Sequence, residues 1–95
     1  MTEHLDDLRA LIDAIDVQLV ELLNRRAELG LEAGRAKVRA GRPLNDPRRE
    51  REVLDRVTEA NAGPLPNEYV VAFYARLIET IRSLEEQEAA EGPRS

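Results

Sequence analysis

Residues 5–40 have the sequence LDDLRALIDAIDVQLVELLNRRAELGLEAGRAKVRA, and this stretch decides the fold. Its apolar residues recur at alternating spacings of three and four, which is typical of one face of a helix. The pattern is carried by Leu5, Leu8, Ile12, Ile15, Leu19 and Leu22. Continued in register to about residue 40, it predicts a helix of about 35 residues, roughly 50 Å long at 1.5 Å per residue. Such a helix is too long to fold back within a 95-residue domain, so we expect it to extend across a partner subunit.

The residues after this stretch predict the end of one helix and the start of another. Gly41 favours a helix C-cap and Pro43 blocks continuation of the helix. Asp46 is a good N-cap residue, and Pro47 suits the first position of the helix that follows. The first two helices are therefore expected at about residues 3–40 and 46–61.

A third helix is expected at about residues 67–89. The turn-forming sequence Asn61-Ala62-Gly63-Pro64 precedes it, and Asn67 is its expected N-cap. No strand pattern is present. Residues 1–90 thus form one predicted all-α domain, and residues 91–95 are expected to be a frayed tail.

The composition excludes several kinds of chemistry. The chain has no cysteine and a single histidine, His4, near its N-terminus, so thiolate metal sites, cysteine nucleophiles and histidine triads are excluded, and we predict neither cofactor nor metal. Aromatic residues are only 3% of the chain, which leaves a monomer with little to fill a core. The composition therefore also favours a homodimer that shares its core.

Charge and hydropathy narrow the choice of partners. The net charge of −5 argues against nucleic acid, which requires a basic face. No apolar run approaches the roughly 20 residues that span a bilayer. The first residues, Met-Thr-Glu-His, lack the basic and apolar segments of a signal peptide. We therefore expect a cytoplasmic protein with no membrane partner.

Charged residues interrupt the apolar pattern of the first helix. Arg26 falls on the apolar stripe, and Lys37 lies about 20° from it around the helix and about 16 Å along its axis. Lys37 is the one lysine among 14 basic residues. Gly30 and Gly34 lie between the two cations, at a cost of about 1 kcal/mol each relative to alanine. They allow two interpretations: close packing of another helix, or room for an anion held by Arg26 and Lys37.

Similar interruptions occur in the other two predicted helices. Arg49 and Glu50 lie over the apolar face of the second helix, whereas its other charged residues point outward. Glu85 lies within about 20° of Tyr74 and Ile78 on the third helix, where a buried carboxylate requires a partner or a proton and an exposed one marks a frayed stripe. Together these charged residues predict an enclosed, cation-rich pocket for a small dianion.

The order and spacing of these segments resemble the all-helical chorismate mutases of the AroQ class over about residues 5–88. The matching segments are Leu8-Arg9, Ile12-Asp13, Ile15-Asp16, Leu22-Leu23-Asn24-Arg25-Arg26, Gly34-Arg35-Ala36-Lys37 and Asp46-Pro47-Arg48-Arg49-Glu50. The last is the most specific, because it resembles the D-x-x-R-E signature of the family. Asn61-Ala62-Gly63-Pro64 also resembles members that are joined to, or work with, the first enzyme of the shikimate pathway, so DAHP synthase is an expected candidate partner.

The resemblance implies an intertwined homodimer that converts chorismate to prephenate for phenylalanine and tyrosine biosynthesis. Arg9 would enter the active site of the partner chain. Arg26 and Lys37 would bind the substrate carboxylates, with Lys37 also donating to the ether oxygen. Arg49 would help to bind a carboxylate, and the Asp46 backbone and Glu50 would contact the ring hydroxyl.

Two positions of the third helix depart from the common family pattern. Ile81 occupies the place of a frequent serine, and Glu85 that of a frequent glutamine. Glu85 would then donate to the ether oxygen only when protonated, which requires a pKa raised by burial. Ile81 would line the substrate-binding site in place of a polar contact.

Three alternatives remain at this stage. A mutase that acts on 4-amino-4-deoxychorismate would share the fold and most of the site. Isochorismate-pyruvate lyases also share the fold but typically lack the pattern of Asp46, Arg49 and Glu50. A non-catalytic helical adaptor, or a regulatory domain that binds prephenate, would explain the apolar stripe but not the charges set into it.

Overall fold

The computed structural model describes residues 2–92, and these form three helices without a strand. They are α1 (Thr2–Arg39), α2 (Pro47–Ala60) and α3 (Asn67–Glu91). The predicted all-α class is confirmed. The predicted tail was wrong at its start, because Glu91 still belongs to α3 and Gly92 caps it; residues 93–95 lie outside the described part of the chain.

The end of α1 depends on a glycine. Gly41 has a φ of +68°, a backbone conformation that residues with a side chain adopt at a cost. This lets the N–H groups of Arg42 and Gly41 donate to the carbonyls of Lys37 and Val38, at 2.8 and 3.1 Å. These two bonds satisfy carbonyls that the helix end would otherwise leave without partners.

The start of α2 is capped as the sequence predicted. Asp46 Oδ1 accepts a hydrogen bond of 3.2 Å from the backbone N–H of Arg49, and Pro47 occupies the first helical position. The cap of α3 was predicted wrongly. Pro66 is its N-cap residue, while the Asn67 side chain accepts a 2.7 Å bond from Asn61 Nδ2 within the turn.

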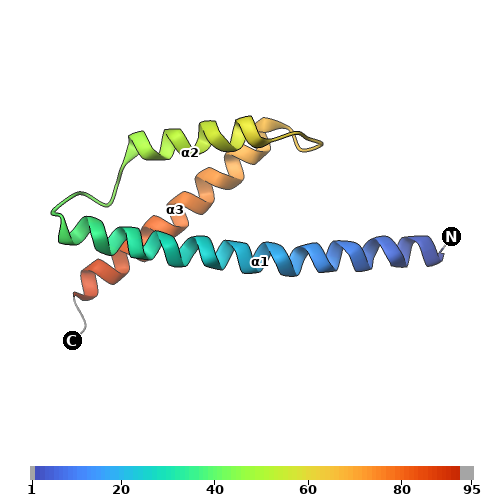
Figure 1. Ribbon diagram of the computed structural model, residues 1–95, viewed down its shortest axis with the longest axis horizontal. Coiled ribbons are helices and arrows are strands. Elements are labelled where there is room, and N and C mark those ends of the chain that lie inside the picture. Colours follow the sequence, from blue (N-terminus) through green and yellow to red (C-terminus); the bar gives the residue numbers. More distant parts are fainter. Residues whose placement is uncertain (1, 93–95) are drawn as a thin grey trace.

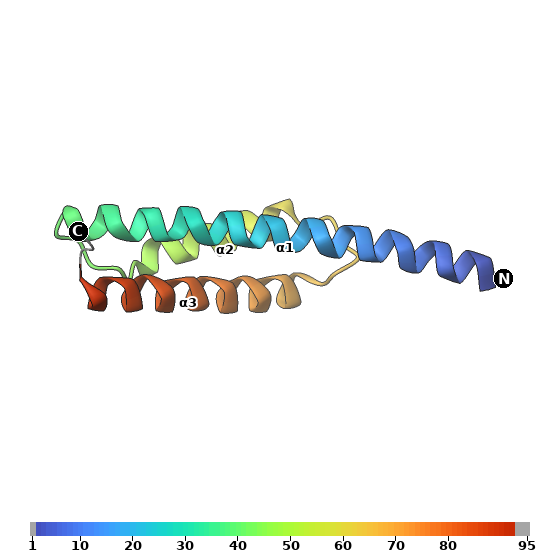
Figure 2. The same cartoon turned by 90° about the horizontal axis from the view of Figure 1, so that it is seen from below.

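The three helices are arranged with α3 in contact with both of the others. It packs against the C-terminal half of α1 and against α2, whereas α1 and α2 have no Cα atoms within 8 Å of each other in the described residues (Figure 1). The view from below shows the same arrangement, with the N-terminal half of α1 projecting beyond the other two helices (Figure 2).

The single chain is far from compact. Its radius of gyration is 17.2 Å, with a longest extent of 59 Å. A compact domain of this length would have a radius of gyration of about 12 Å. Every large apolar side chain of α1 from Leu5 to Leu23 is exposed, and Ile81, 4% exposed, is the buried apolar side chain of the described residues. The stripe that predicts α1 is therefore left uncovered by the chain itself.

No helix within residues 2–92 is both long and apolar enough to cross a bilayer.

Candidate active site

A cavity of about 360 Å³ lies where α3 meets the C-terminal half of α1 and the start of α2. Its charged lining consists of Arg26, Lys37, Asp46, Arg49, Glu50, Arg82 and Glu85. Ile81 and other apolar or small residues form the rest of the wall. Seven of the eight site residues predicted from the sequence therefore come together around one cavity.

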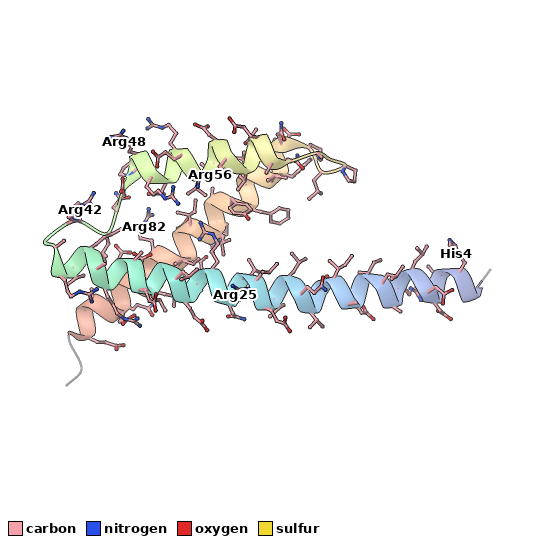
Figure 3. All side chains as sticks on the ribbon, in the orientation of Figure 1. His4, Arg25, Arg42, Arg48, Arg56 and Arg82 are labelled. Atoms are coloured by element: carbon pink, nitrogen blue, oxygen red, sulfur yellow. The ribbon has the colours of Figure 1, made fainter. Side chains whose placement is uncertain are left out.

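Arg9 is the predicted site residue that the chain does not bring to this cavity. It is exposed on the projecting half of α1. Seventeen residues separate it from Arg26, which corresponds to about 25 Å along the helix. His4, near the same end of α1, lies on the far side of the molecule from Arg82 (Figure 3).

Lys37 and Glu85 face each other from α1 and α3. Lys37 Nζ donates to the carbonyl of Leu44 at 3.3 Å and lies 3.9 Å from Glu85 Oε1. The Glu85 side chain is 9% exposed. This confirms the prediction of a buried carboxylate, and the alternative of an exposed one at a frayed end of the stripe is wrong. Glu85 Oε1 is buried, and among residues 2–92 it has no hydrogen-bond partner, because the 3.9 Å to Lys37 Nζ is too long for a hydrogen bond.

The environment of Glu85 favours its protonated form. Burial raises the pKa of its carboxyl above the usual value, and the cations Lys37 and Arg82 offset part of this effect. A protonated Glu85 could donate one hydrogen bond into the cavity. This carboxyl and the Lys37 ammonium together would then present two donors to one bound atom.

The two glycines of α1 allow α3 to approach closely. A Cβ on Gly30 would lie 2.6 Å from Ile81 Cγ2, and a Cβ on Gly34 would lie 2.8 Å from Glu85 Cγ. Close packing is therefore confirmed at both glycines, while Gly30 also lines the cavity together with Arg26 and Lys37, and the interpretation as room for an anion stays a prediction. The space that they leave is filled by side chains of α3, which are thereby set into the wall of the cavity.

Two arginines can reach a ligand from opposite helices. Arg26 is half-buried, and its guanidinium carbon lies 5.8 Å from the centre of the Tyr74 ring. This cation–π contact holds the arginine without using a carboxylate. Arg49 on α2 is about half-exposed, and its Nη1 lies 3.6 Å from Glu52, an exposed pair that contributes little and can be exchanged for a ligand.

Asp46 and Glu50 lie at the start of α2. The side chain of Asp46 is used as the N-cap, and its carbonyl accepts the first helical hydrogen bond, 3.0 Å from the N–H of Glu50. Glu50 is half-buried. Both of its carboxylate oxygens accept hydrogen bonds from Arg82 Nη1, at 3.1 and 2.9 Å.

Arg82 also lines the cavity, and the sequence did not predict it. It reaches from α3 toward the start of α2, where Nη1 also donates to Asn45 Oδ1 at 3.2 Å (Figure 3). One signal could have found it: Arg82 follows Ile78 by four residues, which places it about 40° from the apolar stripe.

The outward face of α2 is exposed, as the sequence predicted. Its charged residues are Arg48, Arg51, Glu52, Asp55 and Arg56.

The charges of the cavity suit a dianion when Glu85 is protonated. Four cationic side chains then face two carboxylates, a net charge of about +2. Among residues 2–92, no group of three or more histidine, cysteine, aspartate or glutamate side chains is arranged to hold a metal ion. The fold and the site thus define an all-helical protein with a pocket rich in cationic side chains.

Comparison with known proteins identifies the family. The chain belongs to the chorismate mutase type II family, whose model matches residues 8–86. The chorismate mutase of Methanocaldococcus jannaschii is 31% identical over 88 residues, which cover 92% of this chain and 89% of that protein. The structure of chorismate mutase (form II) from Thermus thermophilus superposes with a TM-score of 0.84 at 32% identity, covering 87% of this chain and 94% of that one.

Other relatives are longer proteins. A bifunctional chorismate mutase/prephenate dehydratase of Aquifex aeolicus is 37% identical over 89 residues, or 90% of this chain and 25% of that protein. The protein of the same name from Escherichia coli is 40% identical over 73 residues, or 76% of this chain and 19% of that protein. The chain thus spans a quarter or less of the length of these bifunctional relatives.

Proposed function

We propose that this chain catalyses the rearrangement of chorismate to prephenate. In this reaction the C–O bond of an enol ether breaks while a C–C bond forms within the same molecule. The observation that carries the proposal is the pair formed by Lys37 and Glu85 on the wall of a cation-rich cavity. Lys37 Nζ lies 3.9 Å from Glu85 Oε1, which is buried and has no hydrogen-bond partner within residues 2–92. Membership of the chorismate mutase type II family supports the same reaction.

The cationic groups would hold the two carboxylates of the substrate. Arg26 and Lys37 lie on one face of α1, and Arg49 approaches from α2. Planar guanidinium groups bind carboxylates with two parallel hydrogen bonds, which fixes orientation as well as position. Holding both carboxylates would select the compact conformer in which the reacting carbons meet, and this removes much of the entropic barrier.

Lys37 and Glu85 would act on the ether oxygen. Negative charge develops on this oxygen as its bond to the ring breaks, and preorganised donors stabilise that charge more than they stabilise the bound substrate. Glu85 must carry a proton to donate, which agrees with the upward shift of its pKa by burial. Ile81 contributes an apolar surface beside the reacting atoms.

The start of α2 would bind the ring hydroxyl. An ionised carboxylate only accepts hydrogen bonds, and the hydroxyl is the one donor of the chorismate dianion. Glu50 is therefore complementary to this group. The backbone of Asp46 is the second contact that we propose for it.

We further propose that the active unit is a homodimer. The exposed apolar side chains of α1 form a stripe, whereas single apolar residues scattered over a surface need no partner. The same stripe of a second copy would cover it. The projecting half of α1 would then carry Arg9 to the cavity of the partner. Sedimentation of the purified chain should give a dimer; a monomer that retains full activity would contradict this arrangement.

An enzyme assay tests the proposed reaction. The purified protein should consume chorismate, followed by ultraviolet absorbance, with prephenate identified by NMR. Lys37→Ala should lower kcat by about 100-fold or more, because the loss of one such donor typically costs that much. The control is Arg39→Ala, an exposed cation of the same helical turn, which should keep wild-type kcat.

Two results would refute the proposal: no consumption of chorismate by the wild type, or retained activity in Lys37→Ala. A role in phenylalanine and tyrosine biosynthesis, contact with DAHP synthase and a cytoplasmic location stay predictions.

A further inference from the structure

The Arg82–Glu50 ion pair sets the charge at the end of the cavity that would bind the ring substituent. Arg82 Nη1 contacts both oxygens of Glu50, and the two side chains are 28% and 30% exposed. This pair joins α3 to α2 across 32 residues of sequence, and the bond to Asn45 extends it into the segment between α1 and α2. Glu50 is thereby held in place with part of its negative charge balanced.

We propose that Arg82 is a specificity-determining residue that makes this site select a neutral hydroxyl over a cationic ammonium at the ring substituent. The inference rests on the proposed function, and it discriminates between the hydroxyl of chorismate and the amino group of 4-amino-4-deoxychorismate. Arg82 acts through Glu50 and through its own charge; it is not proposed to contact the reacting atoms.

The physical basis is that a neutral hydroxyl and a charged ammonium interact differently with the Arg82–Glu50 ion pair. A hydroxyl donates one hydrogen bond to a Glu50 oxygen whether or not Arg82 is close. An ammonium at the same position would lie close to the guanidinium of Arg82, which already pairs with Glu50. Repulsion between these two positive charges would weaken binding of the amino compound. Without Arg82, the carboxylate alone would attract the ammonium.

The charge of the whole cavity favours the same choice. The four cationic side chains of the lining outnumber its three carboxyl groups, which suits a substrate with two carboxylates. An amino analogue carries an additional positive charge, and its net charge of about −1 matches this cavity less well. Removal of Arg82 would take one positive charge from the lining and reduce this mismatch.

The test compares two substrates across three variants. The quantity measured is the ratio of kcat/KM for chorismate to kcat/KM for 4-amino-4-deoxychorismate. Arg82→Met should lower this ratio by about tenfold or more, and Arg82→Lys should keep most of the wild-type preference. The matched control is Arg76→Met on the same helix, because the Arg76 side chain is 77% exposed and pairs only at the surface with Glu79.

A merely structural role for Arg82 gives a different result. Loss of the α2–α3 contact would lower kcat/KM for both substrates together and leave their ratio unchanged, which would overturn the inference. A wild type that prefers the amino compound would overturn it as well. A wild type that is active on neither compound would instead refute the proposed function.

A second variant keeps the test decisive if Arg82→Met does not fold. Glu50→Gln retains the shape of the side chain and an oxygen that can accept from Arg82. Because the variant lacks the negative charge of Glu50, the positive charge of Arg82 is no longer compensated. The ratio of kcat/KM for chorismate to kcat/KM for the amino compound should therefore rise. An unchanged ratio in Glu50→Gln would contradict the inference independently of Arg82→Met.

Discussion

Gly34 of α1 lies so close to Glu85 of α3 that a Cβ on Gly34 would come within 2.9 Å of Glu85 Oε1. A carboxyl side chain is thus packed against bare helix backbone. The glycine costs helix stability of about 1 kcal/mol relative to alanine. What it provides is the close approach that buries Glu85 and raises its pKa.

Gly34→Ala should therefore lower activity more than stability. The added methyl group gains helix propensity of up to about 1 kcal/mol but displaces the flexible Glu85 side chain from Lys37. We expect kcat to fall by about tenfold or more, because one donor to the ether oxygen is misplaced. Steady-state kinetics with chorismate and urea denaturation give the two quantities.

Gly30→Ala is the matched comparison for this prediction. Its Cβ would lie 2.6 Å from Cγ2 of the buried Ile81, so an overpacking cost of about 1–3 kcal/mol should appear in the free energy of unfolding. Wild-type kcat in Gly34→Ala would show that the position of Glu85 does not matter for catalysis.

The activity should depend on the protonation of Glu85. Because burial raises the pKa of this carboxyl, kcat should be highest below the raised pKa and fall as pH increases through it. Glu85→Gln keeps a donor at every pH, so its profile of kcat against pH should be flatter. Profiles of the same shape for both proteins would exclude this role of Glu85.

The free energy of unfolding should also depend on pH through Glu85. A folded state with a raised carboxyl pKa binds the proton more tightly than the unfolded chain does, so the free energy of unfolding falls as pH rises from the usual glutamate pKa to the raised one. Denaturation curves across that interval should show a smaller slope for Glu85→Gln. The control is Glu79→Gln on the same helix, whose 57% exposed side chain should leave the wild-type slope intact.

Shared active sites predict complementation between two inactive variants. Arg9→Ala lacks the residue proposed to enter the partner's site, and Lys37→Ala lacks a donor in its own site. A heterodimer of the two contains one intact site, so an equal mixture with free exchange should recover about one quarter of wild-type activity. The measurement is chorismate turnover after the chains are mixed and refolded together. Activity no higher than that of the separate variants would show that Arg9 does not act across chains.

Most of the fold follows from local features of the sequence. The spacing of apolar residues defines which face of each helix is apolar, and Gly41, Asp46 and Pro47 act within one helical turn. These are short-range effects, so they can be read without knowledge of the rest of the chain. Asn67 was misassigned because a turn side chain, Asn61, competes for it.

The candidate site was only partly readable in the same way. Arg26 and Lys37 could be placed together because one straight helix relates them, and Glu85 could be placed on the stripe of its own helix. That Glu85 is buried, and not at a frayed end, depends on how closely α3 crosses α1 over Gly30 and Gly34.

By itself the sequence determined three helices, the caps between α1 and α2, and the charged residues that interrupt the apolar stripes. Only the tertiary structure decided that Arg82 holds Glu50 across 32 residues and that Lys37 meets Glu85. The physical reason is that helical periodicity gives the direction of a side chain around its own axis. Which directions converge is set by the crossing of α3 with α1 and α2, and that crossing is a product of packing.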